Sequence, residues 1–472
     1  MAAIDATVVG IALPAIGRQF HAPLTQLQWV VTGYLLTLAA LLLVGGTLGD
    51  QLGRRRVFTY GVVWFAAASA ACAAAPDSAV LVATRILQGI GAALLVPGSL
   101  AILQASFVPD DRARAIGAWS GLGGVATAAG PLLGGYLISA VSWRWIFLIN
   151  LPVGAAVFLV TIRHVPESHQ EQAGSRIDLA GAILTVLTLA GITYGLIEGP
   201  SKGWASAPVL GMLATGLVGA CAFVLAESRA RVPMVPLSIF RERQFTVTNA
   251  LTLLVYAALG GTLFLLPVEL QVVDRYSPLD AGMALLPLTA VMLLLSARSG
   301  RLAARIGPRL QMSIGPVFVG GGIAMLSRTA GSSSYVSAVL PAVLVFGLGL
   351  AITVAPLTAT ALGSVAGDHA GLASAVNNDV ARVGGLIAVA VIPALAGIAG
   401  RDYLHPSEMA GGFRAAVFIA ALWCIAGGAL AAVGIRNPRP ALTEIRAEDA
   451  VKAATAGPLH CALEATPLTT DA

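Results

Sequence analysis

The chain has 472 residues, of which 57% are hydrophobic and only 11% are charged, with a formal net charge of +5. Soluble domains contain about 25% charged residues, and a soluble fold of this composition would have to bury more apolar surface than one core can hold. Lipid must therefore be the solvent for most of the chain, and nucleic acid is not indicated, because the arginines form short clusters between apolar runs, as in loops at a membrane surface.

Fourteen apolar runs are long enough for membrane-spanning helices, which need about 20 residues. The runs lie near 2–17, 27–48, 57–75, 78–105, 114–138, 145–162, 178–197, 208–226, 245–268, 281–297, 311–327, 335–362, 371–398 and 413–435. The chain is therefore predicted to be an all-α membrane protein. The first run is short and contains Asp5 near its start, so we expect either a truncated N-terminus or a first helix that begins inside the bilayer.

The distribution of arginine predicts the orientation in the membrane. An even number of spans places both termini on the same side. If that side is the cytoplasm, the cytoplasmic loops contain most of the loop arginines, including Arg54–Arg56 and the cluster within 298–309. The positive-inside rule therefore predicts a multi-pass protein of the bacterial plasma membrane with both termini in the cytoplasm.

Two polar stretches, 163–177 and 227–243, flank a pair of apolar runs in the middle of the chain. We expect an N-terminal six-helix bundle over 1–163, a connector with two additional transmembrane helices over 164–243, a C-terminal six-helix bundle over 244–436 and a disordered cytoplasmic tail over 437–472. The segment 46–55 recurs in weakened form at 300–309, and repeated halves are typical of transporters that rock two bundles around a central site.

Five motifs in this order resemble those of the major facilitator superfamily, and specifically its fourteen-span drug:proton antiporters of the EmrB/QacA type. They are Asp5-Ala6-Thr7-Val8-Val9 continuing to Pro14, with Gly10 where an Asn is usual; Gly46 to Arg55; Arg85-Ile86-Leu87-Gln88-Gly89; Gly130-Pro131-Leu132-Leu133-Gly134-Gly135; and Trp143-Arg144-Trp145-Ile146-Phe147 with Asn150 and Pro152. The resemblance covers residues 1–435. It implies two pseudo-symmetric six-helix bundles plus two extra helices, and proton-coupled export of small hydrophobic, often cationic, drugs or metabolites.

The loop between the second and third helices is a candidate cytoplasmic gate. Its residues are Gly46, Gly49, Asp50, Gly53, Arg54 and Arg55. Gly49 and Gly53 are expected to permit a turn too tight for residues with a Cβ atom, and Asp50 can accept from Arg54 or from a helix N-terminus of the other half. The resemblance implies a latch that holds the cytoplasmic side closed. The alternative is that the arginines only anchor the topology.

The fifth helix contains four weak helix formers, Gly130, Pro131, Gly134 and Gly135. Proline removes a backbone hydrogen bond, and glycines let membrane helices approach closely. The resemblance implies an antiporter motif whose bend seals the outer side, and it favours an exporter. Close packing without a gating role is the alternative interpretation.

Ionisable groups inside the bilayer are expensive, at about 2.5–3.5 kcal/mol or more each. Arg85 has Gln88 one turn along the same helix face, Asp379 lies three residues before Arg382, and Asp5 lies inside the first helix. Asp5 or Asp379 is the candidate proton carrier, with Arg85 as its gate. The alternatives are a self-neutralising Asp379–Arg382 pair and an Asp5 that only holds the first helix in place.

Glu198 and Glu269 lie about 30 and 36 Å from the starts of their runs at a rise of about 1.5 Å per residue. We therefore expect both to be solvated ends of helices near the outer interface.

Other classes of protein are not indicated. The chain has no phosphate-binding loop for ATP, and its six His residues fall in predicted loops or the tail without the ligand spacing of a metal site. We expect no enzyme activity, no metal and no cofactor other than a proton gradient. The expected partners are a small-molecule substrate, protons and the lipid bilayer; the protein is expected to be a monomer, with accessory export proteins as candidate partners. A proton-coupled uptake symporter on the same fold is the alternative function.

Overall fold

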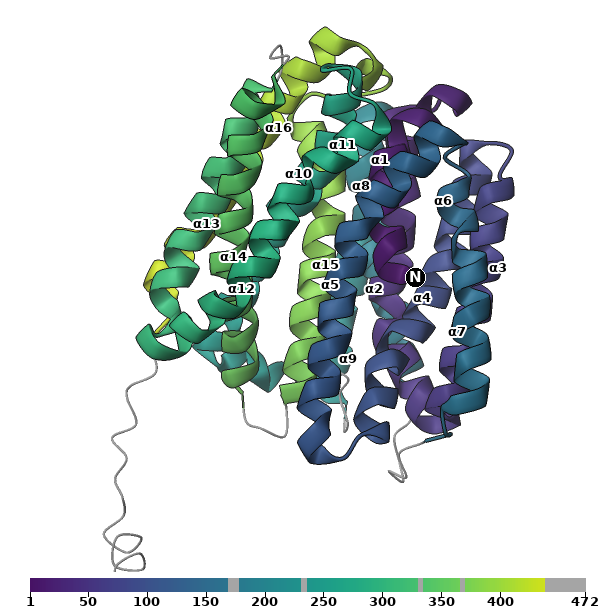
Figure 1. Cartoon of the computed structure of the whole chain (residues 1–472), viewed down its shortest axis with the longest axis vertical. Coiled ribbons are helices and arrows are strands. Elements are labelled where there is room, and N and C mark those ends of the chain that lie inside the picture. Colours follow the sequence, from purple (N-terminus) through teal and green to yellow (C-terminus); the bar gives the residue numbers. More distant parts are fainter. Residues whose placement is uncertain (169–177, 231–235, 330–333, 366–369, 438–472) are drawn as a thin grey trace, which may run out of the picture.

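The computed structural model describes residues 1–168, 178–230, 236–329, 334–365 and 370–437. The tail predicted to be disordered lies outside the described residues after Asn437, as do parts of the two predicted connectors. The described chain is a bundle of long helices (Figure 1), which confirms the predicted all-α membrane fold.

We call α1 to α7 the N-terminal bundle and η1 to α16 the C-terminal bundle. The first group comprises α1 (Ala2–Phe20), α2 (Leu24–Leu52), α3 (Arg54–Ala74), α4 (Ser78–Ser106), α5 (Pro109–Ala140), α6 (Trp145–Leu148) and α7 (Asn150–His164), followed by the two intervening helices α8 (Leu179–Lys202) and α9 (Ala207–Arg229). The second group comprises η1 (Leu237–Arg241), α10 (Arg243–Val272), α11 (Pro278–Ala284), α12 (Leu286–Ile306), α13 (Pro308–Met325), η2 (Leu326–Arg328), η3 (Tyr335–Val339), α14 (Leu340–Gly363), α15 (Ala370–Leu395), η5 (Asp402–Leu404) and α16 (Pro406–Gly434). The domain boundaries drawn from the sequence stay a prediction.

Thirteen helical segments of the described chain are long and apolar enough to cross a membrane. Many of their large apolar side chains point outward, such as Leu122 at 70% and Val433 at 75% exposure. A soluble protein rarely exposes so much apolar surface, so this surface suits contact with lipid. The remaining long helix, α1, carries Asp5 and Arg18.

Helix α1 lies inside the bundle (Figure 1). Val8, Ile11, Leu13 and Ile16 on it are at most 1% exposed, and the helix packs against α5, α10 and α2. The sequence expectation of an unusual first span therefore corresponds to a helix that is covered by protein rather than by lipid.

The two ends of the bundle differ in how the N-terminal and C-terminal bundles meet. We call the end where α2 ends and α3 begins, at Gly53, the arginine-rich end, and the end where α1 ends and α2 begins the opposite end. At the opposite end, toward the top of Figure 1, the segment 21–24 bonds to the segment 400–403. The Leu24 amide donates to the Gly400 carbonyl at 2.7 Å, and the Tyr403 hydroxyl donates to the Ala22 carbonyl at 2.7 Å.

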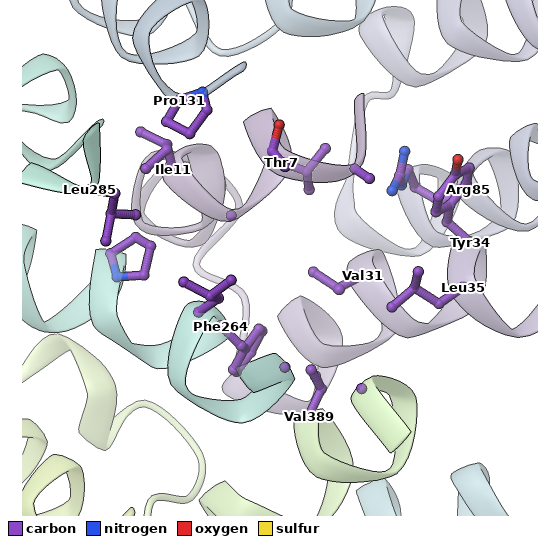
Figure 2. Close-up of a pocket in the computed structure, with 17 residues that line it drawn as sticks. Thr7, Ile11, Val31, Tyr34, Leu35, Arg85, Pro131, Phe264, Leu285 and Val389 are labelled. Carbon is purple, nitrogen blue, oxygen red and sulfur yellow. The ribbon is translucent and has the colours of Figure 1, made fainter. Parts of the chain in front are cut away.

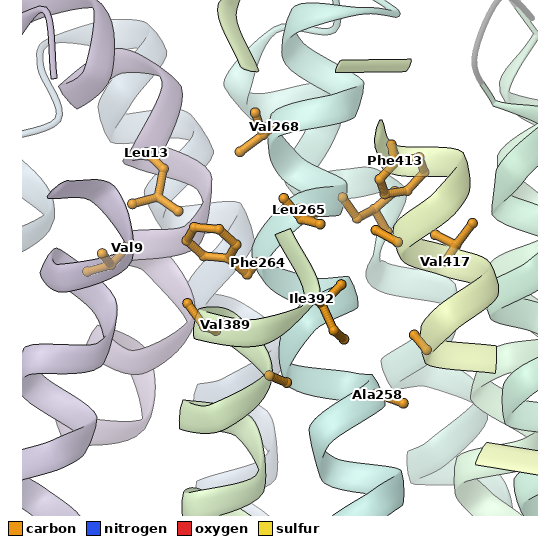
Figure 3. Close-up of a cluster of buried hydrophobic side chains, with 14 of the residues drawn as sticks. Val9, Leu13, Ala258, Phe264, Leu265, Val268, Val389, Ile392, Phe413 and Val417 are labelled. Atoms are coloured by element: carbon orange, nitrogen blue, oxygen red, sulfur yellow. The ribbon is translucent and has the colours of Figure 1, made fainter. Parts of the chain in front are cut away.

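Apolar contacts join the two bundles below this end. Figure 3 shows Phe264 of α10 facing Val9 and Leu13 of α1, with Val389 of α15 beside it. Phe264 is 3% exposed, and all four side chains belong to one buried cluster that spans both bundles. The bundles are therefore in direct contact in the interior of the molecule as well as at the opposite end.

Helices α8 and α9 pack on each other and cover the side of the molecule where α2 meets α15. Their contact is close because Gly191 and Gly216 face one another: a Cβ atom added to either glycine would collide with the backbone of the other helix. At the opposite end, Trp29 of α2 donates its indole N–H to Glu198 of α8 at 3.0 Å. The intervening helices are thus attached to both bundles.

Candidate functional site

A cluster of buried polar side chains lies inside the N-terminal bundle. It consists of Asp5 from α1, Ser69 from α3, Arg85 and Gln88 from α4, and Asn150 from α7, each at most 2% exposed. Polar groups in an apolar interior are stable only when they are hydrogen-bonded and their charges paired. The contacts inside the cluster satisfy this requirement.

Asp5 and Arg85 form a buried ion pair. The Arg85 Nη1 atom lies 2.6 Å from Asp5 Oδ2 and also donates to Gln88 Oε1 at 2.6 Å. Its Nε atom donates to the Val30 carbonyl at 3.0 Å, and the guanidinium carbon lies 4.3 Å from the centre of the Tyr34 ring. The arginine is therefore held by a carboxylate, an amide, a carbonyl and an aromatic face.

The second oxygen of Asp5 accepts two amide hydrogen bonds. Gln88 Nε2 donates to Asp5 Oδ1 at 2.9 Å and to Ser69 Oγ at 2.7 Å. Asn150 Nδ2 donates to the same two oxygens at 3.2 and 3.3 Å. Arg85, Gln88 and Asn150 thus all donate to the Asp5 carboxyl group.

The structure brings the predicted residues Asp5, Arg85 and Gln88 together, and it adds two that sequence reasoning missed. Asn150 was part of a motif that carried the resemblance but was given no role in the site. Ser69 lies in an alanine-rich segment and offers no sequence signal, because a lone serine in a membrane helix usually bonds to its own backbone. Ser69 does so as well, donating to the Phe65 carbonyl at 2.8 Å.

Arg85 and Tyr34 also form part of the wall of a central cavity of about 230 Å³ between the two bundles. Figure 2 shows these two side chains on one side, with Phe264 and Val389 of the C-terminal bundle across from them and Pro131 and Leu285 at another edge. Among the described residues that line the cavity, Arg85 alone is charged. The volume is below the range of about 300–1,000 Å³ of typical small-molecule sites, so larger molecules require the bundles to separate.

The candidate gate loop has one of the two contacts predicted for Asp50. The Arg54 Nε atom donates to Asp50 Oδ1 at 2.8 Å, and Nη2 lies 2.8 Å from the same oxygen. Within the described part of the chain, Asp50 makes no hydrogen bond or ion pair with the C-terminal bundle. The latch between the bundles therefore stays a prediction.

The two glycines of this loop differ, which corrects the prediction. Gly53 has a φ of 106°, a conformation that residues with a Cβ atom rarely adopt. Gly49 lies inside α2, and a Cβ there would meet its nearest neighbour at 3.9 Å, an ordinary contact. The tight turn requires Gly53 only; Gly46 likewise lies within α2, with ordinary space toward Pro97.

Glu167, which follows α7, binds the start of α3. Its Oε1 atom accepts from the Arg55 amide at 3.0 Å, and its Oε2 atom lies 3.7 Å from Arg55 Nε and 3.6 Å from Arg56 Nε. No pattern in the sequence pairs Glu167 with a loop more than a hundred residues away. The C-terminal bundle repeats the arrangement, because Asn437 after α16 accepts from the Arg309 amide at 3.0 Å at the start of α13.

The glycines of the fifth-helix motif are packing positions. A Cβ on Gly134 would lie 2.9 Å from Val8 of α1, and one on Gly135 would lie 2.6 Å from the Pro278 carbonyl oxygen of α11. Gly130 similarly faces Thr7 of α1. The motif therefore brings α5 against α1 and against the C-terminal bundle, while Pro131 lines the central cavity.

Asp379 and Arg382 do not form the pair that their spacing suggested. No hydrogen bond or ion pair joins these two described residues, and Asp379 Oδ1 and Arg382 Nε are buried without a hydrogen-bond partner. Asp379 lines a second cavity, of about 570 Å³, and is not part of the Asp5 cluster. Arg382 still acts electrostatically on Asp379, so the self-neutralising interpretation stays a prediction, without the direct ion pair that the spacing suggested.

The prediction for the two glutamates was wrong for Glu269. Glu198 lies at a helix end, where it pairs with Lys202 at 3.1 Å. Glu269 is 0% exposed, and neither of its carboxyl oxygens has a hydrogen-bond partner. The reason is that α11, α16 and η5 cover the end of α10, which the distance along a single helix cannot reveal.

A substitution at Gly135 is expected to disturb the contact between the bundles. Valine there must move α5 and α11 apart by on the order of 1 Å or more, because carbon atoms need about 3.5–4.0 Å. Pulsed electron resonance between spin labels on Tyr136→Cys and Met283→Cys, in a background without other cysteines, should give longer distances. Gly123→Val on the same helix, where a Cβ meets nothing within 4 Å, is the control; equal distributions for both variants would contradict this packing role.

Gly53→Ala is expected to destabilise the protein, whereas Gly49→Ala is not. The strained φ at Gly53 costs a residue with a Cβ atom about 1–3 kcal/mol, and the added carbon would also approach the Glu167 carboxyl carbon at 2.7 Å. Thermal unfolding of the purified protein in detergent measures the difference. A Gly53→Ala midpoint as high as that of Gly49→Ala would refute this assignment of the turn.

Comparisons with known proteins place this geometry in context. The profile described as Major Facilitator Superfamily matches residues 1–389. The tetracenomycin C resistance and export protein of Streptomyces glaucescens is 36% identical over 395 residues, which cover 84% of this chain and 73% of that protein. The multidrug resistance protein Stp of Mycobacterium tuberculosis is 38% identical over 391 residues, 82% of this chain and 72% of that protein.

A solved structure supports the fold. A bacterial homologue of the human lysosomal transporter Spinster, in an inward-facing and unoccupied conformation, superposes with a TM-score of 0.64. The alignment covers 93% of this chain and 96% of that chain at 16% sequence identity, so the likeness concerns the fold alone.

Proposed function

This chain belongs to the Major Facilitator Superfamily, and from that membership we propose that it is a proton-coupled antiporter that exports small hydrophobic molecules from the cytoplasm. Two features support export. The relatives described above are named for resistance and export. The fifth-helix motif of Gly130, Pro131, Gly134 and Gly135 resembles the antiporter motif, which favours an exporter.

The observation that carries the proposal is the buried Asp5–Arg85 pair at the wall of the central cavity. A proton added to Asp5 removes the negative charge that compensates Arg85. An arginine left without its counter-charge in an apolar interior is strongly unfavourable. Protonation of Asp5 and the Asp5–Arg85 ion pair therefore exclude one another. Proton binding must change the position or the surroundings of Arg85.

Each residue of the cluster then has a role in the exchange. Asp5 binds the proton. Arg85 transmits the arrival of the proton to the central cavity, because the Arg85 side chain both pairs with Asp5 and lines the cavity. Gln88 and Asn150 orient the carboxylate through their amide hydrogen bonds. Cargo that occupies the cavity beside Tyr34 and Arg85 favours the ion-paired state, and so favours release of the proton.

We further propose that the arginine-rich end faces the cytoplasm, as the positive-inside rule predicts. The contacts between segments 21–24 and 400–403 then close the outer side. The cavity would open to the outer side when those contacts break, and the gate loop at Asp50 would close the cytoplasmic side. This is the rocking motion expected of transporters with repeated halves.

Asp5→Asn is expected to reduce uphill export in proteoliposomes with an imposed pH gradient at least about tenfold, because asparagine cannot carry the proton across a cycle. Proton release on cargo addition, followed with a pH indicator in weakly buffered detergent solution, should also disappear. Asp5→Glu keeps a titratable group and should retain measurable coupling, which separates loss of proton binding from misfolding.

Asp77→Asn is the matched control. Asp77 caps the N-terminus of α4 through the Val80 amide at 2.9 Å, and asparagine caps helices about as well as aspartate. This variant should therefore export normally. Full coupling in the Asp5→Asn variant would overturn the proposed role of Asp5.

A further inference from the structure

A second cavity, of about 570 Å³, lies where the intervening helices meet both bundles. We call it the lateral groove. Its walls come from α2, α8, α9, η1, α10 and α15. Most of its large side chains are aliphatic or aromatic, including Leu43, Leu189, Phe223, Phe240, Leu253 and Val383. No residue that lines it also lines the central cavity.

The lateral groove lies near the arginine-rich end. Thr246 and Leu253 line it about 5 and 15 Å along α10 from its start at Arg243, at a rise of about 1.5 Å per residue. The hydrocarbon core of a bilayer is about 30 Å thick, so the groove lies at the depth of one leaflet. With the arginine-rich end in the cytoplasm, this is the inner leaflet.

The groove is open at its side. Val224 on α9 is 51% exposed and Phe240 in η1 is 37% exposed, although both line it. An apolar molecule dissolved among the lipid chains can therefore reach these walls without crossing the aqueous surface of the protein.

Asp379 alone is charged among the described residues that line the lateral groove. Its Oδ1 atom is buried and has no hydrogen-bond partner. The neighbouring polar groups are already engaged, since Thr188 donates to the Leu184 carbonyl at 2.7 Å and Asn249 donates to the Phe245 carbonyl at 2.9 Å. A buried acceptor without a donor is unfavourable, and a cationic group would remove that penalty.

The nearby arginine does not supply this cation. Arg382 shares a face of α15 with Gly385 and Val389, at spacings of three and seven residues, and both of these line the central cavity. It interacts electrostatically with Tyr34, on the wall of that cavity. Arg382 also attracts Asp379 electrostatically, but no hydrogen bond or ion pair joins these two described residues, and Asp379 Oδ1 stays without a donor. A ligand cation can therefore still pair with Asp379.

We propose that the lateral groove is an entry site for amphiphilic organic cations taken from the inner leaflet. The apolar body of the molecule packs against the leucine and phenylalanine side chains, and its cationic group pairs with Asp379. Anionic phospholipids are poor occupants, because their negatively charged headgroups would face a carboxylate. The inference deepens the proposed export function and rests on it for the direction of movement.

Equilibrium binding of radiolabelled tetraphenylphosphonium to the full-length protein in lipid nanodiscs, without a proton gradient, tests the site. Asp379→Asn should weaken binding at least about tenfold, which corresponds to about 1.4 kcal/mol. Binding of neutral triphenylphosphine oxide, a related molecule without the charge, should change less than about twofold. Unchanged tetraphenylphosphonium binding in the Asp379→Asn variant would overturn the proposal.

Two further variants separate the groove from a general effect of charge or folding. Asn378 is exposed and does not line the groove, so the double substitution Asn378→Asp with Asp379→Asn keeps the charge on α15 but removes it from the site. Binding should stay weak in this double variant. Ala220→Phe on α9 fills part of the groove with Asp379 intact and should weaken binding of both molecules. Recovery in the double variant, or normal binding in Ala220→Phe, would contradict the assignment.

The Asp379→Asn variant also distinguishes this inference from the proposed proton coupling. If Asp379 carried the coupling proton, Asp379→Asn would abolish uphill export of neutral and cationic cargo alike. We expect uphill export of neutral cargo to persist, with a higher KM for cationic cargo only. Failure of the Asp5 experiments would leave the binding result at the groove intact, and failure at the groove would leave proton coupling through Asp5 intact.

Discussion

The structure depends on one constraint: neither member of the buried Asp5–Arg85 pair can lose its charge without leaving the other uncompensated. Both residues are 1% exposed, and a single buried charge is far less stable than a hydrogen-bonded pair. The constraint ties α1 to α4 directly, and through Ser69 and Asn150 it also involves α3 and α7. A helix that the sequence showed to be unusual for a membrane span is thereby fixed inside the N-terminal bundle.

The position of the pair connects it with the contact between the bundles. Arg85 lies both in the polar cluster and in the wall of the central cavity, where Phe264 and Val389 of the C-terminal bundle form the other side. The same bundles meet at the opposite end through glycines and backbone hydrogen bonds. A change in the charge of Asp5 therefore acts at the surface along which the two bundles must move. The gate loop is not symmetric either, because its repeat in the C-terminal bundle contains an alanine, Ala304, in place of Asp50.

Several elements were predictable from the sequence because one physical rule determined each of them. The spans followed from the length of apolar runs, and Asp5, Arg85 and Gln88 stood out because polar groups inside a bilayer are expensive. Ser69 and Asn150 could not be assigned in this way, since their contacts depend on how three other helices pack. The spacing of Asp379 and Arg382 suggested an ion pair, but neither a hydrogen bond nor an ion pair joins these two described residues. Glu269 and Gly49 were misjudged for a related reason: burial and backbone conformation depend on neighbours that a single helix does not reveal.

The most direct test of the central claim is infrared difference spectroscopy of the purified protein as cargo binds at a pH where the coupling site is protonated. Cargo binding is expected to remove the carbonyl stretch of a protonated carboxyl group and to produce carboxylate bands, and both signals should be absent when residue 5 is asparagine. If cargo binds with no change in any carboxyl band, or if the change is the same without the Asp5 carboxylate, the Asp5–Arg85 pair does not couple protons to transport.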